Sequence, residues 1–343
     1  MTDFKAIKGF NVKSLAADPK PTGVAGATWS SGGALNTARG DPGGTGIQTA
    51  ALATGGNPGS VTLTEIYDGS SWTEVGDLNL GRYGIAVDGT TTASVAFGGA
   101  SPGNTNETET ELWNGTAWTE VNDLNTARRL LNGAGVSTSA LAFGGYITNV
   151  TNVSETWDGT SWTEGNNLNT ARYGPGGAGI LTAALAFGGN DGSATGKTEK
   201  YNGTSWTEVN DMNTGRRYLG SSGTQTLALG FGGFDTGNLA VTESWNGTSW
   251  TEVADLATAI TNISGGGAGA SNVSALSFGG NNPTPAITTA TEEFTGAGIT
   301  DTIVNEGQVY YNSTAGTMNV TAIVYGTGAW ASGGNLNTAR RSG

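Results

Sequence analysis

The sequence predicts an all-β fold made of repeated four-stranded sheets, and three observations support this prediction. Glycine contributes 59 of the 343 residues, and glycine is unfavourable inside helices. A tryptophan recurs at intervals of 43 to 46 residues, at positions 29, 72, 118, 162, 206 and 250. A Gly-Gly pair accompanies each repeat and begins at positions 55, 98, 144, 188, 232 and 279. A fixed period of this length indicates one structural unit repeated along the chain.

Each unit contains four strand-like segments. The first follows an LNTAR motif or a variant of it, and the next three are typified by TAALAFGG, TEKYNG and SWTEV, which lie between residues 182 and 209. β-branched and aromatic residues alternate in these segments, and Asn-Gly or Asp-Gly marks a hairpin turn. Four strands in about 44 residues are typical of a β-propeller blade. A solenoid fits less well, because solenoid repeats are shorter or helical.

The order of residues in each unit resembles the Kelch repeat. An arginine is followed by an apolar strand, a Gly-Gly pair, an aromatic residue before Asp or Asn, and a tryptophan, as in Arg172, Gly188-Gly189, Tyr201-Asn202 and Trp206. The resemblance covers residues 27–296 and implies a Kelch-type β-propeller. It does not imply one activity, because propellers carry unrelated functions.

The ends of the repeat region indicate how the ring closes. The sixth unit runs from Leu256 to Phe294 and is not followed directly by a fourth strand. A spare strand, GATWSSGG, lies at residues 26–33 before the first LNTAR motif. We therefore expect six blades, with the N-terminal strand completing the last blade and removing an open sheet edge. A seventh blade built from residues 299–343 is the alternative.

Three regions follow from this reading: an N-terminal attachment segment at 1–25, a six-bladed propeller at 26–298 and a C-terminal tail at 299–343. The tail contains two β-rich runs, QVYYNS and MNVTAIVYG, around a TAGT turn, which predicts a β-hairpin. The segment EGQVYYNSTAGTM resembles a stretch of phage tail-fibre and other virion proteins. The opening DFKAIKGFNVKSLAADP is similar to the N-terminal lead of phage structural proteins. These resemblances imply a virion component.

Five arginines at constant register are the candidate ligand-binding residues: Arg39, Arg82, Arg128, Arg172 and Arg216. Each follows the repeat tryptophan by ten residues, and the sixth blade has Ile260 there. Length varies after Gly-Gly, in loops 57–63, 100–108, 146–152, 190–196 and 234–240, which we expect on the same face. In Kelch proteins with known ligands, arginines at this position often line the binding face.

A structural role is the other interpretation of these arginines, and the stronger one. They would then brace neighbouring blades through carbonyl groups or carboxylates. The candidate carboxylates are Asp77, Asp123, Asp211 and Asp255, which lie five residues before the arginine position. If the arginines instead contact a ligand, a positive mouth on an acidic body favours an anionic or polar glycan.

Composition excludes several classes of function. The chain has no Cys and no His, so disulfides, Cys/His zinc sites and imidazole chemistry are ruled out, and we expect no cofactor or metal. The net charge of −13 argues against general binding to nucleic acid or anionic membranes. No apolar run reaches the length of a membrane span. The N-terminus has no apolar core of a secretory signal.

Together these features predict a non-catalytic structural or recognition protein of a phage particle, as a tail fibre, spike or capsid decoration. We expect it to be made in the host cytoplasm and to act in the extracellular virion. Its expected partners are other virion subunits and a glycan or protein on the host surface. Formation of a homo-oligomer is possible in principle and stays open. The alternative is a bacterial Kelch-type module that binds carbohydrate or protein. A sialidase-like glycosidase fits less well, because the repeats are nearly uniform and Glu74 and its equivalents fall on a strand expected to be outermost and solvated.

Overall fold

The computed structural model describes residues 13–15, 26–265, 271–284, 286–296, 309–312 and 317–320. These residues form strands and turns, without a helix among them, and so without one that is long and apolar enough to cross a membrane. The chain divides into two compact units, residues 26–296 and a unit that combines 1–25 with 297–343. Each unit is described separately.

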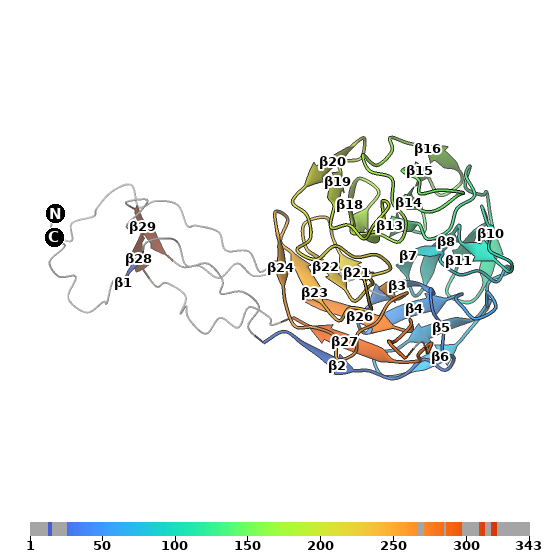
Figure 1. Cartoon of the computed structure of the whole chain (residues 1–343), viewed down its shortest axis with the longest axis horizontal. Helices are drawn as coiled ribbons and strands as arrows, with labels where there is room; N and C mark the ends of the chain where they lie inside the picture. The colour runs from blue at the N-terminus through green and yellow to red at the C-terminus, as the bar shows by residue number, and fades with distance from the viewer. Residues whose placement is uncertain are drawn as a thin grey trace, which may run out of the picture. The chain divides into compact units, whose positions relative to one another are not determined.

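The larger unit is a closed ring of six antiparallel four-stranded sheets, as predicted (Figure 1). Blade 1 comprises β3 (Gly43–Ile47), β4 (Ala50–Thr54), β5 (Thr64–Tyr67) and β6 (Trp72–Glu74), and blade 2 comprises β7 (Ala86–Thr90), β8 (Ala93–Phe97), β11 (Thr110–Trp113) and β12 (Trp118–Glu120). Blade 3 comprises β13 (Asn132–Val136), β14 (Ser139–Phe143), β15 (Ser154–Trp157) and β16 (Trp162–Glu164), and blade 4 comprises β17 (Gly176–Ile180), β18 (Ala183–Phe187), β19 (Thr198–Tyr201) and β20 (Trp206–Val209). Blade 5 comprises β21 (Gly220–Gly223), β22 (Ala228–Phe231), β23 (Thr242–Trp245) and β24 (Trp250–Glu252), and blade 6 comprises β25 (Ser264–Gly265), β26 (Ser274–Phe278), β27 (Thr291–Thr295) and β2 (Thr28–Ser31).

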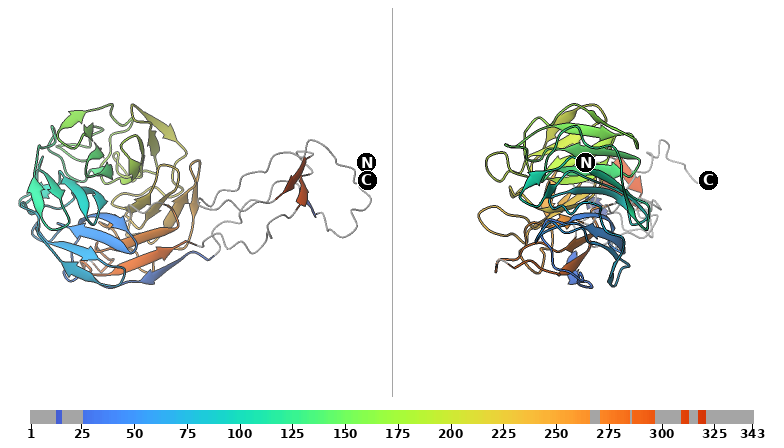
Figure 2. Two further views of the ribbon diagram at one scale, coloured as in Figure 1. Left: turned by 180° about the vertical axis from the view of Figure 1, so that it is seen from behind. Right: turned by 90° about the vertical axis from the view of Figure 1, so that its right-hand side faces the viewer.

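The first strand of every blade lies nearest the axis of the ring. The inner strands β3, β7, β13, β17, β21 and β25 contact one another in order, and β25 returns to β3. The fourth strand, which begins at the repeat tryptophan in blades 1 to 5, lies at the outer edge (Figure 1). Figure 2 shows the same closed ring from behind. A short extra hairpin, β9 (Ala100–Ser101) and β10 (Thr105–Asn106), belongs to the loop after Gly-Gly of blade 2.

The N-terminal strand completes the last blade, which confirms the predicted closure. β2 pairs antiparallel with β27 and places Thr28 opposite Thr295 and Trp29 opposite Phe294. The two ends of the propeller sequence are therefore hydrogen-bonded within one sheet. β2 therefore covers the outer edge of β27, which would otherwise be open to pairing with another chain.

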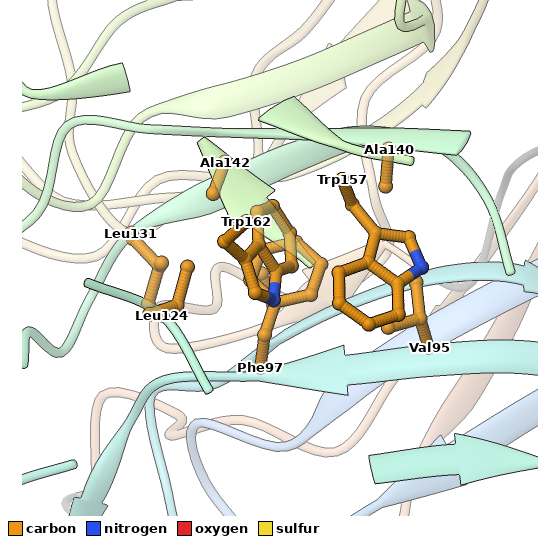
Figure 3. Packing of buried hydrophobic residues seen from close by; sticks show 9 residues of the cluster. Val95, Phe97, Leu124, Leu131, Ala140, Ala142, Trp157 and Trp162 are labelled. Carbon is orange, nitrogen blue, oxygen red and sulfur yellow. The ribbon is translucent and has the colours of Figure 1, made fainter. Parts of the chain in front are cut away.

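Aromatic residues fill the space between neighbouring blades. Between blades 2 and 3, Trp162 packs edge-on against Phe97, with ring centroids 4.8 Å apart, while Trp157 lies near Val95 and Ala140 (Figure 3). The same pattern recurs in the other core clusters. Each buried tryptophan removes about 200 Å² from water, which stabilises the fold by roughly 5 kcal/mol before entropy is considered.

The six repeat tryptophans also join the blades through hydrogen bonds. Each indole N–H donates to a Thr or Ser hydroxyl on the third strand of the preceding blade, at 2.9 to 3.2 Å. The pairs are Trp29–Thr242, Trp72–Thr291, Trp118–Thr64, Trp162–Thr110, Trp206–Ser154 and Trp250–Thr198. The six tryptophans therefore join neighbouring blades both by packing and by hydrogen bonds.

The Gly-Gly pairs are required by backbone conformation. Gly188 and Gly189 have φ values of 65° and 105°, a region that side chains disfavour. A Cβ atom on Gly188 would lie 2.7 Å from the carbonyl oxygen of Arg216 in the next blade. The pair thus turns the chain where it approaches the neighbouring blade closely.

The smaller unit contains a three-stranded sheet. β28 (Val309–Asn312) and β29 (Thr317–Val320) pair antiparallel, as expected for the predicted hairpin, and β1 (Lys13–Leu15) pairs parallel with β28. The two terminal segments, predicted as separate regions, therefore contribute to one sheet. Their remaining predicted features, including residues 321–343, lie outside the described residues.

Candidate functional site

All five candidate arginines lie inside the blades. Their side chains are fully buried, and each forms an ion pair with a glutamate on the third strand of its own blade. The pairs are Arg39–Glu65, Arg82–Glu111, Arg128–Glu155, Arg172–Glu199 and Arg216–Glu243. The aspartates proposed from sequence are not the partners. Asp77 Oδ1 instead accepts the backbone N–H of Thr64, and the other three occupy equivalent places.

Blade 2 shows what each ion pair holds together. Arg82 Nη2 lies 2.9 Å from Glu111 Oε1, and Nη1 donates to the carbonyl oxygens of Gly98 at 2.8 Å and Glu109 at 2.5 Å. The other carboxylate oxygen, Oε2, accepts the backbone N–H and side-chain amide of Asn79, at 2.8 and 2.9 Å. One Arg–Glu pair therefore ties the LNTAR-type loop, the Gly-Gly turn and the third strand together.

This environment favours the bracing interpretation of the arginines. Burial lowers the pKa of the Arg82 guanidinium, and the paired Glu111 acts against that shift. A ligand on the surface cannot reach these guanidinium groups without moving the loop that covers them. Blade 6 has the apolar Ile260 at this place, and its glutamate, Glu292, keeps the bond from the backbone N–H of Ala257 at 2.8 Å. Ligand contact by the five arginines stays a prediction.

The blades differ from one another at three positions on the face where the first strand begins. These are the residue after the arginine position, the next residue, and the residue after Gly-Gly. In blades 1 to 6 the first of these is Gly40, Tyr83, Arg129, Tyr173, Arg217 and Thr261, and the last is Asn57, Ala100, Tyr146, Asn190, Phe234 and Asn281. The two residues form an isolated antiparallel bridge in every blade. The predicted variable loops begin at this bridge, so they lie on the same face.

The middle position of each blade forms a ring around the axis. Asp41, Gly84, Leu130, Gly174, Tyr218 and Asn262 all have φ between 49° and 61°. The N–H of one such residue donates to the carbonyl oxygen of its counterpart in the preceding blade. These bonds are Gly84–Asp41, Leu130–Gly84, Gly174–Leu130, Tyr218–Gly174 and Asp41–Asn262, at 2.7 to 2.9 Å. The ring fixes the backbone and leaves the side chains free to vary.

Large side chains lean over glycines within this ring. A Cβ atom on Gly84 would lie 2.9 Å from the Leu130 side chain, and one on Gly174 would lie 2.8 Å from the Tyr218 ring. The two glycines therefore make room for the larger residue of the following blade. This alternation places Leu130 and Tyr218 at the mouth of the central channel.

Aromatic and cationic side chains gather over blades 3 to 5. Tyr173 packs against Tyr146 and Tyr218, with ring centroids 5.8 and 5.7 Å apart. The guanidinium of Arg129 lies 4.9 Å from the Tyr146 centroid. That of Arg217 lies 5.5 and 5.0 Å from the centroids of Tyr218 and Phe234. We call this half-exposed group the aromatic–arginine arc; its members are Arg129, Tyr146, Tyr173, Arg217, Tyr218 and Phe234.

Small and amide side chains occupy the other side of this face, over blades 6 and 1. Gly40, Asn57, Thr261 and Asn281 stand at the bridge positions. At the channel mouth, the side-chain amide of Asn262 donates to Asp41 Oδ2 at 3.0 Å. The side chains of this face therefore differ in chemistry from one side to the other, although the backbone is nearly six-fold symmetric.

The central channel itself is narrow. Its cavity volume is about 100 Å³, enough for a few water molecules and too small for a sugar ring. Two carboxylates line it, Asp41 at the mouth and Asp88 on β7, and burial raises the pKa of each to about 7. A ligand larger than this must bind on the face and not inside the channel.

The loops extend the surface next to the arc. The side-chain amide of Asn106 donates to the carbonyl oxygens of Tyr146 and Ile147, at 3.1 and 2.8 Å. Arg129 Nη1 donates to the carbonyl oxygen of Asn104 at 3.1 Å and to Asn106 Oδ1 at 2.7 Å. The loop of blade 2 is therefore fastened to blade 3, and the two loops form one continuous edge.

The sequence prediction placed ligand contact at the arginine that five blades share, and it therefore did not include the arc. The arc residues stand one and two places after the repeat arginine and directly after Gly-Gly, where the repeats disagree. That disagreement was the available signal. No family model matches the chain, and the search of curated proteins finds no match.

Proposed function

We propose that this protein is a non-catalytic recognition module that binds its ligand on the face carrying the aromatic–arginine arc. One observation carries the proposal: the repeats agree where they build the ring and diverge at the face positions that hold the arc. Tyr and Arg are the side chains that binding surfaces favour, because they combine a large contact area with hydrogen bonding. A rigid scaffold with variable loops at one end is suited to presenting them.

The carboxylates support binding over catalysis. Hydrolysis of a glycoside requires two carboxylates with different protonation states flanking one bond. In blades 1 to 5, Glu111 and its equivalents are each held by a buried arginine. Glu74 and its equivalents stand exposed on the outermost strands. Neither set combines a pair of carboxylates with the arc.

We further propose that the module belongs to a phage particle, as a tail fibre, spike or decoration that contacts other virion subunits and the host surface. The resemblance of residues 3–19 and 306–318 to phage structural proteins supports this assignment, and the Kelch resemblance supports recognition. The strands β1 and β28 join both terminal segments in one unit. A unit separate from the propeller is suited to attachment to the particle. The propeller face would then serve for contact with the host surface.

Quantitative mass spectrometry of purified particles tests the virion assignment. We expect the chain in many copies per particle. If it is absent from particles and abundant as free protein, the chain is instead a bacterial Kelch-type module for carbohydrate or protein.

Binding of the labelled full chain to host cells tests the face. Replacing Tyr146 and Tyr173 by Ser removes two half-exposed rings without altering the backbone ring at the channel mouth, and we expect binding to fall at least about tenfold. The matched control is Ile180→Ser, since Ile180 is 53% exposed at the opposite end of β17. Equal binding by the double variant and the control would overturn the proposal.

A further inference from the structure

Arg217 differs from the other described arginines because its guanidinium has no hydrogen-bond acceptor among the described residues. Five arginines are paired with glutamates, and Arg129 donates to the loop of blade 2. For Arg217, neither an ion pair nor a hydrogen bond of the guanidinium is found within the described residues. Its Nε atom is buried without an acceptor, as it is in the five paired arginines, and Arg217 differs from them in that its two Nη groups also lack one there. A guanidinium whose Nη groups lack an acceptor in the described part of the chain can donate them to an acceptor on a ligand.

The position of Arg217 is fixed by packing. Its guanidinium lies 5.0 Å from the centroid of Phe234 and 5.5 Å from that of Tyr218. Phe234 is held in turn by its backbone bridge to Arg217 itself. A guanidinium placed against two rings loses little freedom on binding, and its planar fork matches a carboxylate.

The surroundings of Arg217 offer a surface for a ligand rich in hydroxyl groups. Tyr173 stands beside Tyr218 in the arc and is half exposed. Across the channel mouth stand Asn57, Thr261 and Asn262, uncharged groups that both donate and accept hydrogen bonds. The carboxyl group of Asp41 also lies there and accepts a hydrogen bond from the side-chain amide of Asn262. Aromatic faces next to amides and hydroxyls suit the alternating C–H and O–H surfaces of a saccharide.

We propose that Arg217 is the anion subsite of this face and that it binds the carboxylate of an acidic saccharide whose sugar rings lie along Tyr173 and Tyr218. This inference rests on the proposed function and specifies its ligand class. The overall charge of −13 repels polyanions at long range, so the ligand must present its carboxylate directly to Arg217 and not depend on a general basic surface.

Calorimetric titration of the full chain tests the assignment with four probes: an oligogalacturonate, its neutral methyl ester, a sulfated oligosaccharide and a polyglutamate peptide. We expect the oligogalacturonate to bind best and to lose about tenfold or more in affinity with Arg217→Gln, the loss of one charged hydrogen-bonding pair. Arg217→Lys should retain part of the affinity, because it keeps the charge and loses the fork. The ester should bind wild type and Arg217→Gln equally.

Lys200→Gln is the matched control, since Lys200 is also a cation packed over an aromatic ring, 5.3 Å from the centroid of Trp245, but it lies on β19 outside the arc. It should leave the affinity for oligogalacturonate within about twofold of wild type. The inference is overturned if Arg217→Gln binds oligogalacturonate as well as wild type, if the sulfated saccharide or the peptide binds better, or if no probe binds. If the inference fails while Tyr146→Ser/Tyr173→Ser still loses host-cell binding, the proposed function stands without it.

Discussion

Trp29 donates a hydrogen bond from its indole nitrogen to Oγ1 of Thr242 at 3.0 Å, across 213 residues of sequence. The tryptophan lies on the N-terminal strand of blade 6, and the threonine lies on the third strand of blade 5. The same ring also packs against Phe231 and Phe294, with centroids 5.0 and 5.1 Å away. Trp29 thus links blade 6, which the N-terminal strand completes, to blade 5.

Removing the closing strand should destabilise the propeller. Deletion of residues 1–33 takes away β2 together with Trp29, leaves β27 as an open edge and exposes Phe294. We expect the free energy of unfolding in urea to fall by about 3–5 kcal/mol or more. Deletion of residues 1–25 is the matched control, because it spares β2. Equal stability of the two deletion variants would contradict the role of β2 in closure.

The interblade hydrogen bonds can be tested at a single buried site. Thr110→Val keeps the shape of the side chain and removes the acceptor for Trp162 Nε1, which lies 2.9 Å from Thr110 Oγ1. The buried indole N–H then lacks a partner, which should lower the free energy of unfolding by about 1–3 kcal/mol. The control Thr119→Val changes an exposed threonine on β12 and should have little effect. A thermal shift of the same size in both variants would argue against the bond.

The two interpretations of the repeat arginines predict different results for Arg128→Ala/Arg172→Ala. As buried braces, their loss leaves Glu155 and Glu199 charged and unpaired in the core, which should cost about 3–5 kcal/mol per site. Urea unfolding should show this loss, and Arg172→Ile/Glu199→Gln should recover part of it, because blade 6 already tolerates Ile260. A fully stable double alanine variant that no longer attaches to host cells would support ligand contact instead.

The carboxylates of the channel should make the fold less stable at neutral pH. Burial raises the pKa of Asp88 to about 7, and Asp88 Oδ2 has no hydrogen-bond partner among the residues that the structure describes. The folded state therefore favours the protonated acid, so its stability is full below about pH 4 and falls as the pH rises through 7. Asp41 titrates in the same direction.

Asp88→Asn should flatten this pH dependence and raise the melting temperature at pH 8, with Asp41→Asn/Asp88→Asn flattening it further. Melting curves between pH 4 and pH 8 measure the effect, which should amount to no more than a few kcal/mol for each group. Identical pH profiles for wild type and the double variant would show that neither carboxylate is desolvated. Asp68→Asn, in an exposed hairpin turn, serves as the control.

The strictly repeated features of this protein could be read from sequence because each depends on its own short stretch of chain. Trp162, Gly188-Gly189 and the Asn-Gly turns recur with one period, and the period sets the number of strands in a blade. The spare strand around Trp29 and the missing strand after Phe294 indicated the closure, since a ring without a completed last blade would expose an edge.

Tertiary structure decided which groups meet. Glu111, and not Asp123 or its equivalents, pairs with an arginine, because the third strand lies beneath the LNTAR loop only after the sheet has formed. Tyr146, Tyr173 and Arg217 come from three blades and form one surface only because the ring places equivalent positions side by side. The same holds for Lys13–Leu15 and Val309–Asn312, which pair across nearly the whole chain. Local periodicity specifies the repeating unit, whereas contacts between distant residues depend on how the units pack, and that information is not contained in any single repeat.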